Sequence, residues 1–404
     1  MRSYAVRYLG WAPLTRPFPP PKVKRLFPGS VTSKRVEDCA VSRRLLVMGA
    51  GGGATNNLVR SLRRGDLSLH IAGCHHDRFT LKQSTTDQTY LLPRVDHSAF
   101  FPSLNAVLKR ERIELVIPNS DADVRVLAER RDEVECRLFL PGVNTIALCQ
   151  DKYELTALLA ARGVSVPSTH AVTSLGEVPA IFEHFSPPAP VWCRLRAGQG
   201  GMGAMLVRTP SQAISWMQYW EQLRGISPTS FTLSEYLPGR DFACQALFEN
   251  GRLVLIKSYE RLTHLGAGVH PAGVSSLAAL SKTVFAPSVV AVCAAAVRAI
   301  DPVASGVFCF DVKEDARGVP CLTEINAGRF GLSTNIFDIP GRHNTASTYV
   351  RLAVGDPVDI LDAYDVAEGF YMIRDYDTEP AVFHADEVFH GTQEVWEELT
   401  LAQP

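Results

Sequence analysis

Short apolar runs alternate with stretches of helical periodicity through residues 43–150. The runs at 45–48, 69–73, 115–118 and 138–140 predict strands, and the stretches at 55–64, 100–112 and 121–133 predict helices. Strands that alternate with helices of this length form a parallel sheet with helices on both faces. We therefore expect a Rossmann-like domain at residues 43–150.

After residue 150 the pattern changes to one helix followed by pairs of strands. Asp151 and Glu154 are typical of a helix start, and Gly163 marks the end of this helix. Three hairpins follow, which pair residues 191–195 with 205–207, 242–248 with 253–257, and 307–312 with 321–325. The fold class that we predict is α/β in the first part and α+β, with antiparallel sheet, in the second.

The most apolar window, residues 283–297, spans about 15 residues and contains Pro287. A helix that crosses a bilayer needs roughly 20 apolar residues. We therefore predict a buried helix here, and no membrane partner.

Charge and cysteine content narrow the classes of protein. The 404 residues include 41 Lys and Arg against 42 Asp and Glu, so no basic field favours nucleic acid as a partner. The nine cysteines occur singly, without a CxxC pair, which argues against a zinc site or a disulfide framework and favours the cytoplasm. The sequence leaves the oligomeric state open, and a homodimer is one candidate.

The two ends of the chain differ from its middle. Residues 1–42 are rich in proline and basic side chains, which favours a disordered or loosely docked extension over a transit peptide. Residues 384–404 are expected to form a C-terminal tail.

The first glycine cluster lies directly after the first predicted strand. Gly49, Gly51 and Ala54 satisfy the dinucleotide-binding fingerprint in its Ala variant, and Asp77 lies near the position of an acidic ribose ligand. Glycines are equally common where a strand packs tightly on its helix. The cluster therefore leaves two interpretations open, a nucleotide site and a packing turn.

A second glycine-rich loop, residues 196–203, is predicted between two antiparallel strands and follows Arg194. Its four glycines, Gly198, Gly200, Gly201 and Gly203, allow the backbone to present N–H groups to an anion. No Gly-Lys-Ser/Thr follows, so the loop is not a Walker A motif. A phosphate-binding role is favoured over a flexible surface hairpin.

The third hairpin carries two acids and an amide. If it folds symmetrically about Arg317 and Gly318, Asp311 lies opposite Glu324, and Asn326 shares their face of the sheet. Carboxylate and amide oxygens suit Mg²⁺, and like charges directly opposite each other need a cation. We predict a metal site at Asp311, Glu324 and Asn326.

Candidates for other roles are less specific. Asn119, Ser120 and Asp121 follow a strand at the sheet edge where open α/β sheets bind ligands, although they equally fit a helix cap. Histidines that could act as a general base are His264, His270 and the pair His75 and His76, although structural or surface roles are more common for such residues.

Taken in order, the motifs resemble the ATP-grasp superfamily, and within it the branch of the carbamoyl phosphate synthetase large subunit. The resemblance covers about residues 43–383. It rests on the first glycine turn and on the following segments: IPNSDAD at 117–123, QDKYEL at 150–155, VWCRLRAGQGGMGA at 191–204, SEYLPGRDF at 234–242, GVHPAG at 268–273, and FDVKED with LTEINAGRFG within 310–331.

The resemblance implies a pre-ATP-grasp domain at 43–150, an N-terminal lobe with the glycine-rich loop at 151–235, and a C-terminal lobe with the metal site at 236–383. It also implies roles for single residues. ATP would be held by Lys152, Arg194, the loop glycines Gly198, Gly200, Gly201 and Gly203, the adenine-binding hinge Glu235, Tyr236 and Leu237, the ribose ligand Asp241, and His270. Mg²⁺ or Mn²⁺ would be held by Asp311, Glu324 and Asn326.

The catalytic residues that the resemblance implies are Arg194, Asn326 and Arg329. The family spacing is Glu-x-Asn-Pro-Arg, whereas this chain has Arg329 one position later, after Ala327 and Gly328. The role of Arg329 is therefore the least secure of the set.

The function that the resemblance implies is ATP-dependent joining of a small carboxylate and an amine through an acyl phosphate, with release of ADP and phosphate. Three alternatives stay open. One is phosphorylation of bicarbonate, as in carbamoyl phosphate synthesis, although the chain has a single such unit. The others are an NAD(P)-dependent oxidoreductase, based on the first glycine cluster, and a nucleotide-binding protein without catalysis.

Overall fold

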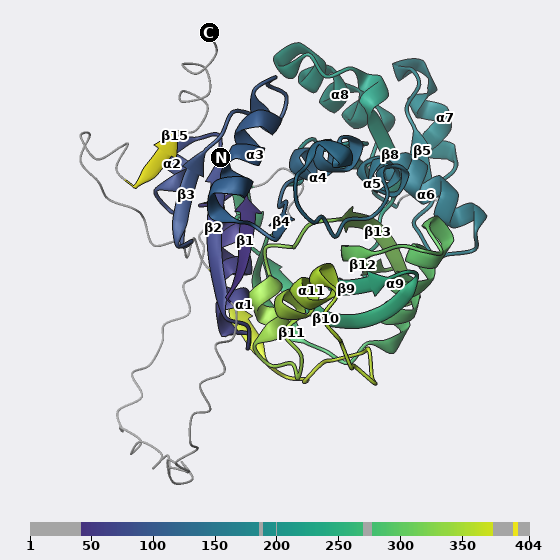
Figure 1. Ribbon diagram of the computed structural model, residues 1–404. Coiled ribbons are helices and arrows are strands. Elements are labelled where there is room, and N and C mark those ends of the chain that lie inside the picture. The colour runs from purple at the N-terminus through teal and green to yellow at the C-terminus, as the bar shows by residue number, and fades with distance from the viewer. Residues whose placement is uncertain (1–41, 186–188, 199, 270–276, 375–390, 395–404) are drawn as a thin grey trace, which may run out of the picture. The chain divides into compact units, whose positions relative to one another are not determined.

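The computed structural model describes residues 42–185, 189–198, 200–269, 277–374 and 391–394. The N-terminal extension, His270 and most of the expected C-terminal tail lie outside these residues. Within them, three sheets form the frame of the molecule (Figure 1).

The first sheet is parallel throughout and contains five strands in the order β15-β3-β2-β1-β4. Helices cover it on both sides, as the alternating pattern predicts. Its elements are β1 (Arg43–Met48), α1 (Gly53–Arg64), β2 (Leu69–His75), α2 (Arg78–Leu81), β3 (Gln88–Leu91), α3 (Phe100–Glu111), β4 (Leu115–Ile117), α4 (Asp121–Glu129), a 3₁₀ turn (Arg131–Glu133), α5 (Val143–Gln150) and β15 (Thr392–Glu394).

Two expectations for this part are wrong. Residues 138–140 form no strand, and only a single bridge joins Arg137 to Leu115. Leu138 and Leu140 instead pack against the core between the sheet and α3, and Phe139 packs against the core on the other face. Residues 391–394, expected in a tail, supply β15, which pairs with β3 at the edge of the sheet.

The second sheet has four antiparallel strands in the order β5-β8-β6-β7. Its elements are α6 (Lys152–Ala161), β5 (Thr169–Ala171), a 3₁₀ turn (Leu175–Glu177), α7 (Val178–Glu183), β6 (Val191–Leu195), β7 (Met205–Val207), α8 (Pro210–Arg224), a 3₁₀ turn (Pro228–Ser230) and β8 (Phe231–Glu235). One face packs on α7 and α8. The predicted hairpin of 191–195 with 205–207 is confirmed.

The third sheet has six antiparallel strands in the order β13-β12-β9-β10-β11-β14. Its elements are β9 (Asp241–Glu249), β10 (Arg252–His264), a 3₁₀ turn (Ala267–Val269), β11 (Ala278–Thr283), α9 (Pro287–Ile300), β12 (Gly306–Glu314), β13 (Pro320–Ala327), α10 (Thr334–Asp338), α11 (Thr345–Val354) and β14 (Tyr371–Ile373). Both hairpins predicted here are confirmed.

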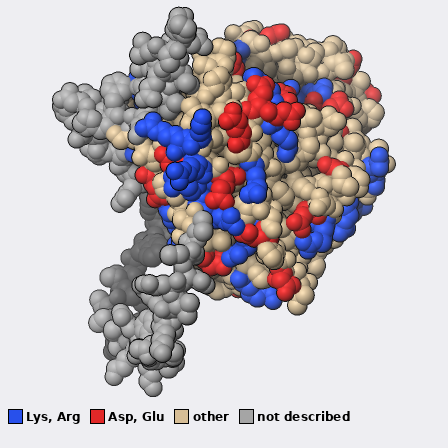
Figure 2. All heavy atoms as spheres, viewed as in Figure 1, with Lys and Arg blue, Asp and Glu red and all other residues tan. Residues whose placement is uncertain are grey.

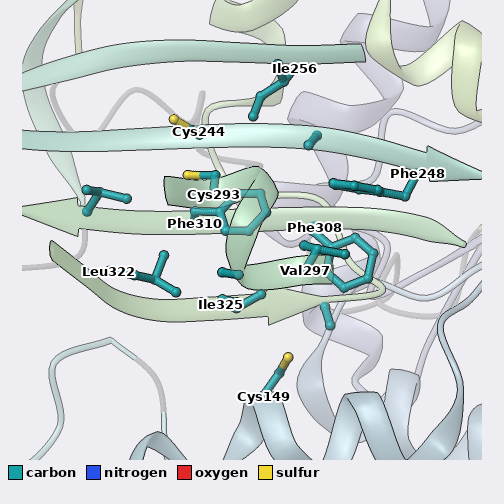
Figure 3. Packing of buried hydrophobic residues seen from close by; sticks show 14 of the residues in the cluster. Cys149, Cys244, Phe248, Ile256, Cys293, Val297, Phe308, Phe310, Leu322 and Ile325 are labelled. Atoms are coloured by element: carbon teal, nitrogen blue, oxygen red, sulfur yellow. The ribbon is translucent and has the colours of Figure 1, made fainter. Parts of the chain in front are cut away.

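Alternation along these strands separates an apolar face from a polar one. Phe248, Phe308 and Phe310 point to one side, where they pack with Cys293 and Val297 of α9 (Figure 3). The helix predicted in the most apolar window is therefore confirmed, and it begins at Pro287, whose missing N–H costs nothing at a first helical position. The opposite face of β9 and β12 is free to carry charged side chains.

A buried ion cluster joins β10 to α10 and to the segment after α11. The Nζ atom of Lys257 lies 3.4 Å from an oxygen of Asp338 and 3.2 Å from an oxygen of Asp365, and each of the three side chains is 2% exposed or less. Lys257 also donates to the carbonyls of Phe337 and His343. The cluster is satisfied throughout, as a buried charge requires.

We expect Asp365→Asn to lower the free energy of unfolding by about 2 kcal/mol at neutral pH, because the carboxylate accepts two backbone N–H bonds besides pairing with Lys257. Burial alone would raise the pKa of Asp365, but these partners hold it below the ordinary value of 3.8. The difference from wild type should therefore be constant above that value and shrink as the pH falls below it. Urea denaturation at several pH values tests this, and a difference that grows on acidification would contradict it.

On the face shown in Figure 2, Lys and Arg side chains are interspersed with Asp and Glu. Among the described residues, no helix combines the length and the apolar character that a membrane crossing requires.

Candidate active site

A cleft of about 620 Å³ lies between the four-stranded and six-stranded sheets. Its wall includes all but two of the residues that the sequence predicts for the site. These are Lys152, Arg194, Gly198, Gly200, Gly201, Glu235, Tyr236, Leu237, Asp241, Asp311, Glu324, Asn326 and Arg329. Of the remaining two, Gly203 lies at the base of its loop and His270 lies outside the described residues.

The glycine-rich loop joins β6 to β7 at one side of the cleft. All four predicted glycines have a positive φ, between 70° and 128°, which other residues rarely adopt. Gly203 is also closely packed, since a Cβ there would lie 2.7 Å from the Leu195 side chain. The loop conformation thus requires glycine at each of these positions. Gly203 packs against Leu195 and does not line the cleft.

Two buried cations face the hairpin of β12 and β13, which carries the candidate metal ligands. Lys152 donates from Nζ to the Gly198 carbonyl at 2.8 Å and lies 3.6 Å from Glu324. Arg194 donates to the Thr323 carbonyl and lies 4.0 Å from Glu324, while its Nε is buried and has no partner among the described residues. Burial lowers the pKa of Arg194, and the nearby carboxylates of Glu324 and Asp311 offset part of this effect. The two cations therefore meet at one carboxylate.

The predicted pairing of Asp311 with Glu324 is confirmed, although the reason is more complex than symmetry about the turn. Glu314 pairs with Pro320, which centres the turn on Arg317, half a residue earlier than assumed, and a bulge at Thr323 then shifts the register by one. Without the bulge, Asp311 would face Thr323. Asn326 lies opposite Cys309, two positions along the same face.

The donors in this set fit a hard cation in kind. No three His, Cys, Asp or Glu side chains converge to hold a metal in the described part of the chain. The candidate set is instead two carboxylates and one amide oxygen, which suits Mg²⁺ because this ion keeps several waters and shares substrate phosphates. Each donor contacts a cationic side chain: Asp311 pairs with Arg261, Glu324 with Lys152, and Asn326 with Arg329.

The position of Arg329 shows how the chain accommodates the extra residue between Asn326 and this arginine. Gly328 has a φ of +82° and packs closely against Val124, so the chain turns after β13 and returns Arg329 to the cleft. Arg329 donates to the Asn326 side-chain oxygen at 2.5 Å and also pairs with Asp121. Burial alone would lower the pKa of Arg329, but Asp121 outweighs it and raises the pKa. The extra residue thus leaves Arg329 beside the hairpin of β12 and β13.

The sequence did not predict the surroundings of Asp241. Arg261 donates to Asp241 at 2.9 Å and also to Asp311, while His264 lies 3.3 Å from Asp241. Burial alone would raise the pKa of Asp241, but Arg261, His264 and Lys313 outweigh it and lower the pKa. A signal was present, because Arg261 and His264 lie on the strand that the second hairpin pairs with Asp241.

Residues 236–240 connect β8 of the four-stranded sheet to β9 of the six-stranded sheet. Gly239 is required there because a Cβ would overlap the side chain and carbonyl of Glu314. Arg240 fixes the same contact through a salt bridge to Glu314 at 2.7 Å. The predicted hinge, Glu235 to Leu237, therefore lies along the wall of the cleft between the two sheets.

A second cavity, of about 510 Å³, adjoins the cleft at the carboxyl edge of the first sheet. Five residues line both: Lys152, Gly198, Met202, Glu324 and Asn326. The first sheet and its connections contribute His76, Arg94, Ser120, Asp121 and Asp123. Ligands of open α/β sheets bind at this edge.

Of the three candidates that follow β4, Asn119 supports a neighbouring loop, and Ser120 and Asp121 line the second cavity. Asn119 is buried and bonds to Thr55 and to the backbone N–H of Phe330, so it supports the loop after β13. Ser120 caps α4 by accepting from the Asp123 N–H. Burial raises the pKa of Asp123, and its bonds to Ser120 and the nearby His76 offset part of the rise.

The first glycine cluster is a packing turn. A Cβ at Gly51 would overlap the Thr80 carbonyl, so this glycine permits α2 to approach the turn. Asp77 caps α2, where its carboxylate accepts from the N–H groups of Phe79 and Thr80. These contacts account for the fingerprint and its acid without a dinucleotide.

No protein-family model matches the chain. Solved structures of other proteins share its fold. An L-amino acid ligase from Bacillus licheniformis is 13% identical, with a TM-score of 0.58 over 78% of this chain and 74% of that one. A biotin carboxylase from Campylobacter jejuni is 13% identical, with a TM-score of 0.61 over 81% and 74%. An N5-carboxyaminoimidazole synthetase from Staphylococcus aureus, complexed with ADP, is 12% identical, with a TM-score of 0.60 over 81% and 80%. At these identities the likeness is one of fold.

Proposed function

We propose that this chain, which has the ATP-grasp fold of these structures, is an ATP-dependent ligase that joins a small carboxylate to an amine. The observation that carries the proposal is the shared wall between two cavities. The cleft has the residues to hold a nucleotide and its metal, and the second cavity opens onto the same side chains, Lys152, Glu324 and Asn326.

In this proposal ATP occupies the cleft. The backbone of residues 235–237 binds adenine, Asp241 binds the ribose, and the glycine-rich loop with Lys152 and Arg194 binds the phosphates. The orphan Nε of buried Arg194 supports this arrangement, since a phosphate oxygen would give it an acceptor. Asp311, Glu324 and Asn326 would hold Mg²⁺ or Mn²⁺, which neutralises charge on the phosphates.

The acid and the amine occupy the second cavity. A carboxylate oxygen of the acid attacks the γ-phosphorus, ADP leaves, and an acyl phosphate results. The neutral amine nitrogen then attacks the acyl carbon, the C–O bond to phosphate breaks, and the nitrogen gives up one proton to a base. Phosphoryl transfer depends mainly on positioning and on charge neutralisation, which Lys152, Arg194 and Arg329 can supply.

Two side chains of the second cavity can accept a proton from the amine. His76 stacks on His75 with ring centroids 4.5 Å apart, and the half-buried Asp123 lines the same cavity. A carboxyl whose pKa is raised is better matched to proton transfer near neutral pH. We assign the general base to this pair, Asp123 with His76.

ADP release in the presence of Mg²⁺ tests the proposal. The assay uses a pool of amino acids and small carboxylic acids, a separate bicarbonate arm, and arms that lack either the acids or the amines. Release that requires both an acid and an amine is expected. Release with bicarbonate as the only acid would instead favour carboxyphosphate formation, and release that ignores both additions would overturn the proposal.

A further inference from the structure

Arg261 lies at the floor of the cleft, on β10, where it bridges two carboxylates of neighbouring strands. Its register partner on β9 is Asp241, and Asp311 lies one strand further, on β12. One guanidinium nitrogen donates to Asp241 at 2.9 Å and the other donates to Asp311. The side chain is only 10% exposed.

The third nitrogen of this guanidinium has no acceptor. Nε of Arg261 is buried and without a partner in the described part of the chain, although it belongs to a residue that lines the cleft. Burying a donor unpaired costs free energy, so such a group points to an acceptor that arrives with a ligand. Nδ1 of His264, on the same strand, is buried and unpaired as well.

Asp311 cannot bind a metal ion while it is paired with Arg261. A guanidinium and a divalent cation at one carboxylate would repel each other strongly in a site of low dielectric. Asp241 offers the guanidinium a second anchor, so releasing Asp311 does not leave the arginine without a partner.

We propose that Arg261 exchanges partners when the cleft fills: it releases Asp311 to the metal ion, keeps Asp241, and donates its freed N–H groups to a phosphate of the nucleotide. This inference rests on the proposed function. It makes Arg261 a competitor of the metal in the empty protein and a ligand of the nucleotide in the filled one. Arginine suits both states, since its planar fork forms several directed bonds at once.

The exchange predicts that one substitution, Arg261→Gln, changes the metal affinity and the nucleotide affinity in opposite directions. In Arg261→Gln, Asp311 is free in the empty protein, so the affinity for Mn²⁺ alone should rise about tenfold. The affinity for ADP in the presence of Mn²⁺ should fall about tenfold, because a charged phosphate contact is lost. The affinity for adenosine, which has no phosphate, should stay unchanged.

The measurements use defined probes. Titration of the metal-free full chain with Mn²⁺, followed by the electron paramagnetic resonance of the free ion, gives the metal affinity. Isothermal titration calorimetry with ADP in the presence of Mn²⁺, and with adenosine, gives the nucleotide affinities. Arg252→Gln is the matched control, because Arg252 lies on the same strand but is 54% exposed and pairs with Glu249 outside the cleft.

Opposite changes in Mn²⁺ and ADP affinity, with adenosine unaffected, are the expected result. A loss of both affinities, or a change in neither, would overturn the partner exchange. If Arg261→Gln does not fold, Arg261→Lys replaces it: one ammonium group holds one carboxylate at a time, and the same directions are expected at about threefold. Failure of the wild-type chain to bind ADP in the presence of Mn²⁺ would overturn the proposed function itself.

Discussion

Replacement of Glu324 by glutamine is expected to reduce ADP release about 100- to 1,000-fold, the cost of removing one charge-stabilising group from an active site. Glu324 occupies the centre of the proposed chemistry. Lys152 and Arg194 converge on its carboxylate, Asp311 lies directly opposite, and it lines both the cleft and the second cavity. Glutamine keeps the shape of the side chain and removes the charge that would bind a metal ion.

The measurement is the steady-state rate of ADP formation under the conditions that give the highest wild-type rate. Glu221→Gln, an exposed change on α8, controls for the substitution itself and should leave the rate unchanged. The circular dichroism spectrum of Glu324→Gln should match that of wild type. An unchanged rate would remove Glu324 from the metal site.

Lys257→Met is expected to lower the free energy of unfolding by about 3–5 kcal/mol. The methionine fills a similar volume, but it leaves Asp338 and Asp365 as buried carboxylates without their shared cation. Asp338 also anchors the start of α11 by accepting from the Thr345 N–H. The loss should therefore extend to the contacts that connect α10 and α11 to β10.

Chemical denaturation at neutral pH measures this loss. Lys109→Met, at an exposed position in the last turn of α3, is the matched control and should change stability by less than about 0.5 kcal/mol. Equal stabilities of Lys257→Met and wild type would mean that the cluster contributes nothing net.

Hairpin registers show what the sequence could and could not predict. Turn signals located all three hairpins, but the bulges within the second and third hairpins have no signal in the sequence. The bulge at Thr323 happens to give the pairing of Asp311 with Glu324 that simple symmetry suggested. The bulge between Leu253 and Leu255 does the reverse: it shifts β10 by one residue, places Arg261 opposite Asp241, and so hides Arg261 from a symmetric alignment.

Short strands were one part of the fold that the pattern missed. β3, β5, β14 and β15 have three or four residues each, too few for a periodicity to appear. Their pairing depends on segments far away in the sequence; β15, for example, pairs with a strand about 300 residues earlier. Helices α1, α3, α4, α6 and α9 and the glycine-rich loop were predicted because their signals are local, whereas α8 and α11 were not predicted.

The candidate site divides in the same way. Residues within a recognisable motif, such as Lys152, Arg194 and Glu324, line the cleft as expected. Only part of the second cavity was predicted: Ser120 and Asp121 were candidates because they follow a strand, whereas the cavity as a whole is assembled from strand ends, a helix end and β13. The first glycine cluster illustrates the converse: Gly51 and Asp77 match a nucleotide fingerprint, yet their contacts are those of a turn and a helix cap.

Oxygen transfer from the acid to phosphate tests the central claim most directly. The acid that supports ADP release is labelled with ¹⁸O in its carboxylate, and the phosphate released during turnover with the amine is analysed by mass spectrometry. Because the attacking oxygen stays on phosphorus when the amine cleaves the acyl phosphate, we predict one ¹⁸O atom in each phosphate formed. Phosphate that carries no label would show that the acid is not phosphorylated, and would contradict the account.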